Sequence, residues 1–224
     1  RAGFHHGGLV ELDPSACATM RDGGLSPVIE CDVRDLATIA GAITGPVDAL
    51  WSSFPCQCWS TAGDRLGAKD PRNGWPWTVA AVDRFGPTWL MAENVPGLLY
   101  HRKECDRRDP QPEDCPGCYV EWTILPDLRS RFASVQVLRL NAADFGVPQH
   151  RRRVFFVAGP RPVMPPRATH GPGMFSKPYR TMGEALGLIG SRAQVVAAGE
   201  TGAGRPRPMS QAAPAIGTKA TAYL

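Results

Sequence analysis

Short apolar runs alternate with longer mixed segments along the chain, which is the pattern of β–α units. We predict strands at Gly8–Leu12, Val28–Cys31, Asp48–Ser52, Thr88–Ala92, Val135–Leu140 and Val154–Ala158. The last of these is a continuous apolar run, as expected of a strand buried on both faces of a parallel sheet. The stretch Trp75–Phe85 has helical spacing, and a proline stands before three of the strands, where a helix must already have ended. The pattern predicts an α/β fold with a mostly parallel sheet.

Polar residues fall at the carboxyl ends of several of the predicted strands. They are Glu11, Asp32, Cys56 and Glu93. In open α/β sheets this edge is where ligands bind, so we expect the functional site to lie there.

Composition and charge narrow the class of protein. The chain has 224 residues, 43% of them hydrophobic, and no apolar run approaches the ~20 residues of a membrane helix. The net charge is +4, but residues 1–148 carry 14 basic and 19 acidic groups, whereas residues 149–224 carry 11 and 2. The C-terminal third can therefore meet a polyanion. Composition excludes a collagen, a coiled coil, a membrane protein and a fully disordered chain.

The chain ends and the cysteines give two further expectations. There is no initiator Met and no signal-peptide pattern, and no closing element follows the last residues, so we interpret the chain as a fragment of a longer protein. Seven cysteines without an export signal indicate thiols or metal ligands in a reducing compartment rather than a disulfide framework.

Three segments carry candidate chemistry. Cys56 follows a proline directly after a strand, and a thiol held there is either a nucleophile or a buried structural thiol. Glu93 ends another strand, where a partly buried carboxyl group can stay protonated and donate to a heterocycle nitrogen; the alternative is a solvated charge. Strand alternation puts Arg151 and Arg153 on one face, away from Arg152, where two guanidiniums are costly without an anionic partner; the alternative is a solvated basic patch, the usual role of such a triplet.

Together, the Pro-Cys-Gln loop at 55–57, the Glu-Asn-Val turn at 93–95 and the Gln-x-Arg-x-Arg strand at 149–153 resemble the DNA cytosine-5 methyltransferase family. Further segments resemble the family at 11–16, 32–33 and 70–73. The similarity covers roughly residues 1–190 and implies the doubly wound, Rossmann-like sheet of methyltransferases that depend on S-adenosylmethionine.

The resemblance also implies a mechanism. Cys56 would add to C6 of cytosine, and Glu93 would hold the ring at N3 and the exocyclic amine. Arg153 would hold O2, and Arg151 would steady the catalytic loop and the substrate. The methyl group comes from S-adenosylmethionine, and because C6 lies inside the duplex stack, the base must first be flipped out.

Cofactor residues follow from the same resemblance. Glu11 would accept hydrogen bonds from the ribose hydroxyls and Asp32 from the adenine amine, with Val33 beside the ring. Leu12 stands where a larger side chain often stacks on the adenine, and Pro55 belongs to the same set.

The chain departs from the family at several places. The first glycine-rich motif should lie upstream of Arg1, and the motifs that follow the target recognition domain are absent. Ser52 and Ser53 stand in place of glycines, and Trp59 in place of a Phe. If the 224 residues were the whole polypeptide, we would expect weak or no cofactor binding. We divide the chain into a catalytic core, 1–190, and a linker or start of the target recognition region, 191–224, which is rich in Ala, Gly, Pro and Arg.

A cysteine-rich insertion at 101–118 is not part of the family's shared core. His101, Cys105, Cys115 and Cys118 have soft or borderline donor atoms that suit a tetrahedral, structural zinc ion. Two alternatives are a surface insertion with incidental thiols and a redox dithiol formed by Cys115 and Cys118.

The basic C-terminal third has two interpretations, phosphate contacts or a solvated connector. The residues concerned are Arg161, Arg167, Lys177, Arg180, Arg192, Arg205 and Arg207.

We therefore expect an enzyme that methylates C5 of cytosine in double-stranded DNA, as in restriction–modification systems of bacteria or phages. Its expected partner beyond DNA is a cognate restriction endonuclease, and we expect a monomer in the cytoplasm, associated with the nucleoid and not with a membrane. One alternative is a tRNA cytosine-5 methyltransferase of the same superfamily. Another is a DNA-binding remnant without catalytic activity, against which the trio Cys56, Glu93 and Arg153 argues.

Overall fold

The computed structural model describes residues 3–55, 57–59, 67–103, 105–106 and 113–187, and the backbone of four short strands beyond them. In this part of the chain, no helix combines the length and the apolar character needed to cross a membrane. Two compact units make up the chain. The first comprises Arg1–Gln136 and Phe156–Pro162, and the second comprises Val137–Phe155 and Val163–Leu224.

The predicted strands and the predicted helix are confirmed. The observed strands are β1 (Leu9–Glu11), β2 (Val28–Glu30), β3 (Ala49–Ser52), β4 (Trp89–Asn94), β5 (Ser134–Asn141) and β7 (Arg152–Gly159). Helix α3 spans Trp75–Phe85, as the spacing predicts, and it ends at Gly86, whose φ of 54° lies in the left-handed region that glycine tolerates. The other α-helices in the described part of the first unit are α1 (Pro14–Asp22), α2 (Leu36–Ala42), α4 (Pro116–Tyr119) and α5 (Leu125–Arg129).

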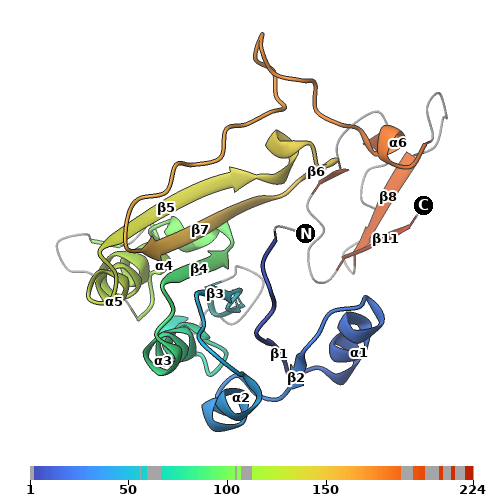
Figure 1. Ribbon diagram of the computed structural model, residues 1–224. Helices are drawn as coiled ribbons and strands as arrows, with labels where there is room; N and C mark the ends of the chain where they lie inside the picture. Colours follow the sequence, from blue (N-terminus) through green and yellow to red (C-terminus); the bar gives the residue numbers. More distant parts are fainter. Residues whose placement is uncertain are drawn as a thin grey trace. The chain divides into compact units, whose positions relative to one another are not determined.

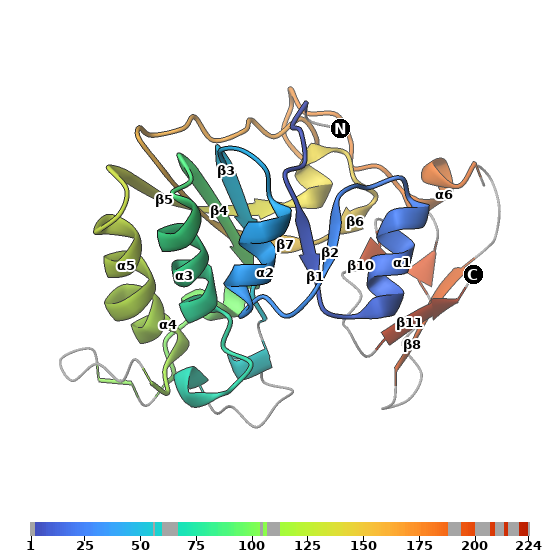
Figure 2. The ribbon, with the colours of Figure 1, turned by 60° about the horizontal axis from the view of Figure 1, so that its bottom comes forward.

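Parallel pairing brings the carboxyl ends of neighbouring strands to one edge. In β1 and β2, Leu9 lies opposite Val28 and Glu11 opposite Glu30. Strands β3 and β4 are also parallel, with Ser52 opposite Ala92. The strands form two hydrogen-bonded sheets rather than one, β1-β2 and β3-β4-β7-β5. Helices α2 and α3 lie along one face of β3 and β4 (Figures 1 and 2).

The core of the first unit is built on large apolar side chains. Those that are fully buried are Trp75, Leu90, Leu98, Ile124, Leu128 and Phe156. Strand β4 alternates, with Leu90, Ala92 and Asn94 buried and the residues between them half-buried. This alternation places the Glu93 side chain on the face opposite to that of Asn94.

The second unit contains short strands within the segment predicted as a linker. Strand β8 (Gln194–Gly199) pairs antiparallel with β11 (Ala220–Tyr223) and β9 (Arg207–Pro208). Strand β6 (Gln149–His150) pairs parallel with β10 (Ala213–Pro214). The assignment of 191–224 to a linker or to the start of a recognition region stays a prediction, as does the boundary at 190.

Candidate active site and cysteine cluster

Two carboxylates lie at the carboxyl edge of the β1-β2 sheet, as the sequence predicts. Glu11 is the last residue of β1, and its Oε1 accepts hydrogen bonds from the backbone N–H groups of Leu12 at 2.8 Å and Asp13 at 2.9 Å. Asp32 lies two residues beyond the end of β2. Since β1 and β2 are parallel neighbours, both groups reach the same edge.

Asp32 is held in a fixed orientation by Arg34. Its carboxylate accepts the Arg34 backbone N–H at 2.9 Å and the guanidinium Nε at 2.9 Å. The side-chain hydrogen bond from Arg34, with the backbone one, lowers the pKa of Asp32 to about 2. The group is therefore an anion at neutral pH and can act only as an acceptor.

Apolar surface is exposed beside these two carboxylates. Leu12, directly after β1, is 63% exposed, and Val33, next to Asp32, is 45% exposed. An edge with two carboxylate acceptors and two exposed apolar side chains fits a nucleoside, which offers a diol, an amine and a flat ring. These residues therefore fit the nucleoside part of S-adenosylmethionine.

Cys56 lies outside the described residues, but Phe54 and Pro55, the two residues before it, contact other segments of the first unit. Phe54 is buried, and its ring packs edge-on to the Trp75 ring with centroids 5.5 Å apart. Its carbonyl accepts a hydrogen bond of 3.1 Å from Asn94 Nδ2, which is itself buried. Gly74 leaves space for the same turn, because a Cβ there would lie 2.7 Å from Pro55 Cδ. The segment leading into Cys56 is thus tied to the end of β4 and the start of α3.

Asn94 is a positioning residue that the sequence predicts only as part of the Glu-Asn-Val turn. Its Oδ1 also accepts the backbone N–H of Val95 at 2.8 Å, so the amide is used at both ends. The signal for this role in the sequence was a polar residue, Asn94, at a position of β4 whose alternation predicts burial. Glu93, its neighbour, is half-buried near the carboxyl end of β4.

The two arginines of the predicted site belong to the second unit. Arg151 is exposed and directly precedes β7, and Arg153 is half-buried within β7. Arg153 Nη1 donates to the carbonyl of Arg152 at 2.8 Å. The convergence of both guanidiniums with Glu93 stays a prediction.

Polar contacts also order the segment that follows the predicted catalytic loop. The buried Asp70 carboxylate accepts the Arg72 backbone N–H at 2.8 Å and the guanidinium at 2.6–2.9 Å. The side-chain hydrogen bond from Arg72 lowers the pKa of Asp70 to about 2. Asn73 is buried, and its Nδ2 donates to the Ala68 carbonyl at 3.1 Å and to the Tyr119 hydroxyl at 2.9 Å. Burial raises the pKa of Tyr119 to about 12, so its hydroxyl stays protonated.

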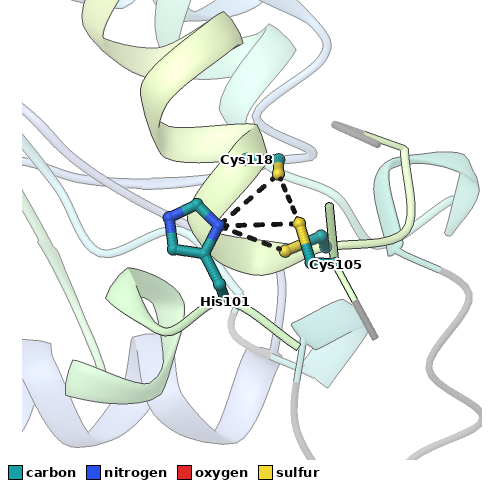
Figure 3. Close-up of side chains that lie close together, drawn as sticks. His101, Cys105 and Cys118 are labelled. Carbon is teal, nitrogen blue, oxygen red and sulfur yellow. Dashed lines mark hydrogen bonds between the residues drawn. The ribbon is translucent and has the colours of Figure 1, made fainter. Parts of the chain in front are cut away.

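The four predicted metal ligands come together in the first unit. The donor atoms of His101, Cys105, Cys115 and Cys118 all lie within 4.8 Å of one another. His101 Nδ1 is 3.7 Å from the Cys105 and Cys115 sulfurs and 3.5 Å from the Cys118 sulfur. Figure 3 shows His101, Cys105 and Cys118 pointing toward one another. Such a cluster could hold a metal ion.

A profile of the C-5 cytosine-specific DNA methylases matches residues 1–163, which is more than half of the chain. The chain therefore belongs to the C-5 cytosine-specific DNA methylase family, and the resemblance carried by the three motifs is confirmed. It is 33% identical over 212 residues to the type II methyltransferase M.AquIA of Picosynechococcus sp., covering 84% of this chain and 81% of that protein. It is 37% identical over 163 residues to M.NgoMIV of Neisseria gonorrhoeae, covering 70% of this chain and 46% of that protein.

Solved structures show the same fold. A DNA modification methyltransferase encoded within an E. coli prophage superposes with a TM-score of 0.50 at 23% identity, covering 71% of this chain and 41% of that chain. DNMT2 of Spodoptera frugiperda also gives a TM-score of 0.50, at 17% identity, covering 80% and 51%. The predicted Rossmann-like methyltransferase fold is confirmed. This chain spans less than half the length of several relatives. It covers 46% of M.NgoMIV and 35% of M.NaeI of Lentzea aerocolonigenes.

Proposed function

We propose that this chain carries the methyl-transfer centre of an enzyme that methylates C5 of cytosine in double-stranded DNA. The observation that carries the proposal is the hydrogen bond from Asn94 Nδ2 to the Phe54 carbonyl. This bond links the backbone of Phe54, two residues before the proposed nucleophile Cys56, to Asn94. Asn94 in turn follows Glu93, the carboxyl group that would bind the base. A thiol and a carboxyl group held in this relation suit attack on a cytosine ring.

Each residue then has a role in the chemistry. Cys56, as a thiolate, adds to C6 while Glu93 holds N3 and the exocyclic amine, and the added electron pair makes C5 nucleophilic. As the resemblance to the family implies, Arg153 would hold O2 of the base and Arg151 would steady the catalytic loop. Once C5 has bonded to the methyl group, loss of the C5 proton to a base re-forms the C5–C6 double bond and expels the Cys56 thiolate, which restores the aromatic ring. A base inside the duplex is out of reach of the thiol, so the reaction needs a flipped nucleotide.

S-adenosylmethionine supplies the electrophilic methyl group. The ordered, anionic Asp32 would accept from the adenine amine, and Glu11 from the ribose hydroxyls, with Leu12 and Val33 on the ring. Pro55, exposed at the start of the catalytic loop, would border the same site. Glu11 Oε1 already accepts two backbone N–H groups, which fixes the orientation of the carboxylate.

Double-stranded DNA is favoured as the substrate because the relatives described above are type II methyltransferases of bacteria. For the same reason, a restriction endonuclease of matching specificity is the expected companion, and the bacterial cytoplasm the expected location. Transfer RNA is the competing substrate.

Covalent trapping tests the proposal. The full-length protein is incubated with S-adenosylmethionine and duplex DNA containing 5-fluorocytosine, whose C5 fluorine cannot leave as a proton does. We expect a stable protein–DNA adduct that is lost in Cys56→Ser and retained in the matched control Cys31→Ser. A folded protein that forms no adduct, or an adduct that persists in Cys56→Ser, would refute the role of Cys56. Methyl transfer to tRNA and not to DNA would refute the substrate.

A further inference from the structure

The cysteine cluster lies outside the proposed methyl-transfer centre, and its ligand geometry is specific. We propose that His101, Cys105, Cys115 and Cys118 bind one structural zinc ion, and that this zinc site anchors residues 67–73, the segment that follows the catalytic loop. The two parts of the proposal rest on different contacts and have separate tests.

The nitrogen–sulfur distances match a tetrahedral zinc site. With Zn–S near 2.3 Å and Zn–N near 2.0–2.1 Å, tetrahedral angles place a nitrogen about 3.6 Å from each sulfur. His101 Nδ1 lies 3.5–3.7 Å from all three sulfurs. The Cys105 and Cys118 sulfurs are 3.1 Å apart, longer than the ~2.05 Å of a disulfide bond. Two sulfurs on a tetrahedral zinc ion lie about 3.8 Å apart, so zinc binding would move these two sulfurs apart by about 0.7 Å.

Contacts around the cluster fix the orientation of its ligands. His101 Nδ1 faces the sulfurs, while Nε2 lies 3.2 Å from Glu121 Oε1. A carboxylate at this place keeps the proton on Nε2 and leaves Nδ1 free to bind a metal. The backbone N–H of Arg102 donates to the Cys115 sulfur at 3.4 Å, which would stabilise a thiolate. The His101 ring lies against Gly117, where a Cβ would come within 2.7 Å of it.

Burial argues for a structural metal rather than a redox dithiol. Cys115 and Cys118 are each 1% exposed, whereas a redox-active pair needs a thiol that a partner can reach. Four protein ligands fill a tetrahedral zinc site and leave no position for water or substrate. The ion would therefore stabilise the fold without entering the reaction.

The segment that carries two of the ligands also supports the residues after the catalytic loop. The Ala68 N–H donates to the Glu113 carbonyl at 2.8 Å, and Lys69 forms an ion pair with the Glu113 carboxylate. Gly67 has a φ of 60°, and a Cβ there would lie 1.9 Å from the same carbonyl. Only glycine allows this close approach.

A second contact lies directly after the last ligand. Tyr119 follows Cys118 in helix α4, and its hydroxyl accepts a hydrogen bond from Asn73 Nδ2. The zinc ligands at 115 and 118 thus lie between two attachments to the 67–73 segment, one at Glu113 and one at Tyr119. Ordering of residues 113–119 by the metal would order residues 67–73 as well.

Metal analysis tests the first part. Protein purified under reducing conditions should contain about one zinc per chain, and Cys118→Ser should lose it on dialysis, whereas the control Cys31→Ser should keep it. Because Cys118→Ser can also unfold the protein, Glu121→Gln is the second variant: it retains all four ligands and should weaken zinc binding about 10–100-fold. Zinc below about a tenth of an equivalent in the wild type, iron in its place, or retention of zinc by Cys118→Ser would overturn the assignment.

Cobalt substitution reports the ligand set without any variant. Co²⁺ added to zinc-depleted protein should give the intense visible bands of a tetrahedral site together with sulfur-to-cobalt charge transfer. Weak bands typical of an octahedral site, or no charge transfer, would exclude a site with three thiolates.

Amide hydrogen exchange tests the anchoring. Removal of zinc with a chelator should increase exchange at 67–73 and 113–119 by about tenfold or more and leave the β1–α1 segment, 9–22, unchanged. Unchanged exchange at 67–73, or an equal increase in all three segments, would overturn the anchoring. This readout is independent of methyl transfer, so it separates the zinc proposal from the proposed function.

Discussion

The turn before Cys56, the proposed nucleophile, can be displaced by a single methyl group. In Gly74→Ala, the new Cβ would lie 2.7 Å from Pro55 Cδ and 2.9 Å from Phe54 Cβ. Carbon atoms in contact prefer about 3.5–4.0 Å, so the turn and the start of helix α3 must separate by about 0.6–0.8 Å. The backbone of Gly74 is an ordinary helical one, with φ −82° and ψ −4°, so the contact and not backbone strain is what the variant tests.

The structure indicates which side moves. Trp75 is buried and its Nε1 donates to Asp127 at 2.8 Å, so helix α3 is held in place, whereas Pro55 is exposed. We expect the displacement to pass into the loop that carries Cys56. Overpacking of this size costs about 1–3 kcal/mol of stability. A misplacement approaching 1 Å at a reacting group can cost about 100-fold in rate.

The assay is the single-turnover rate of adduct formation with 5-fluorocytosine DNA, measured together with the melting temperature. Gly74→Ala should form the adduct about 10–100-fold more slowly than the wild type. Gly41→Ala is the matched control, because its helix α2 position has nothing within 4 Å of the added Cβ; it should keep the rate and gain up to about 1 kcal/mol. A Gly74→Ala rate within about twofold of the wild type, at an unchanged melting temperature, would refute the reasoning.

Three further predictions concern the supports of the site. The hydrogen bond from Arg72 lowers the pKa of Asp70 from 3.8 to about 2, so it stabilises the fold above about pH 4. This stabilisation is lost as the pH falls from about 4 toward 2. Between these pH values, the free energy of unfolding in urea should depend less on pH in Asp70→Asn than in the wild type. Asn94→Asp puts an acceptor where the loop carbonyl needs a donor, and adduct formation should slow about tenfold or more while the dissociation constant for DNA, measured by fluorescence anisotropy, stays unchanged. In Gly117→Ala, the new Cβ displaces the His101 ring, and zinc affinity measured by chelator competition should fall about tenfold or more. An unchanged affinity would show that the His101 ring does not pack against Gly117 when zinc is bound.

The local pattern of apolar and polar residues was sufficient to predict the strands and the helix on which the proposed site residues lie. The strands β1, β2, β3 and β4 and helix α3 follow from short apolar runs interrupted by glycine and proline, which act over a few residues. For the same reason, the sequence predicts that Glu11 and Asp32 share an edge. The four cluster residues were also readable, since metal ligands recur at short spacings such as Cys-x2-Cys.

Contacts between distant segments were not predictable in this way. Asn94 reaches a carbonyl 40 residues away and Asn73 a hydroxyl 46 residues away, and no local period encodes either pairing. The turn Val120–Ile124 is a π-helix between α4 and α5, where the Leu125 N–H bonds to the Val120 carbonyl. Pro126, which has no N–H to donate, follows directly, and this was a signal in the sequence for a local change of helix type.

The hydrogen bond between Asn73 and Tyr119 limits how this enzyme can be recombined with its relatives. A chimera that exchanges residues 100–129 alone takes the hydroxyl from one parent and the amide from the other, and a mismatch leaves a buried amide with one hydrogen bond too few. Crossover points placed before residue 67 and after residue 129 keep both partners from one parent. Shuffled libraries built on such a block should therefore yield more folded members than libraries cut between its two halves.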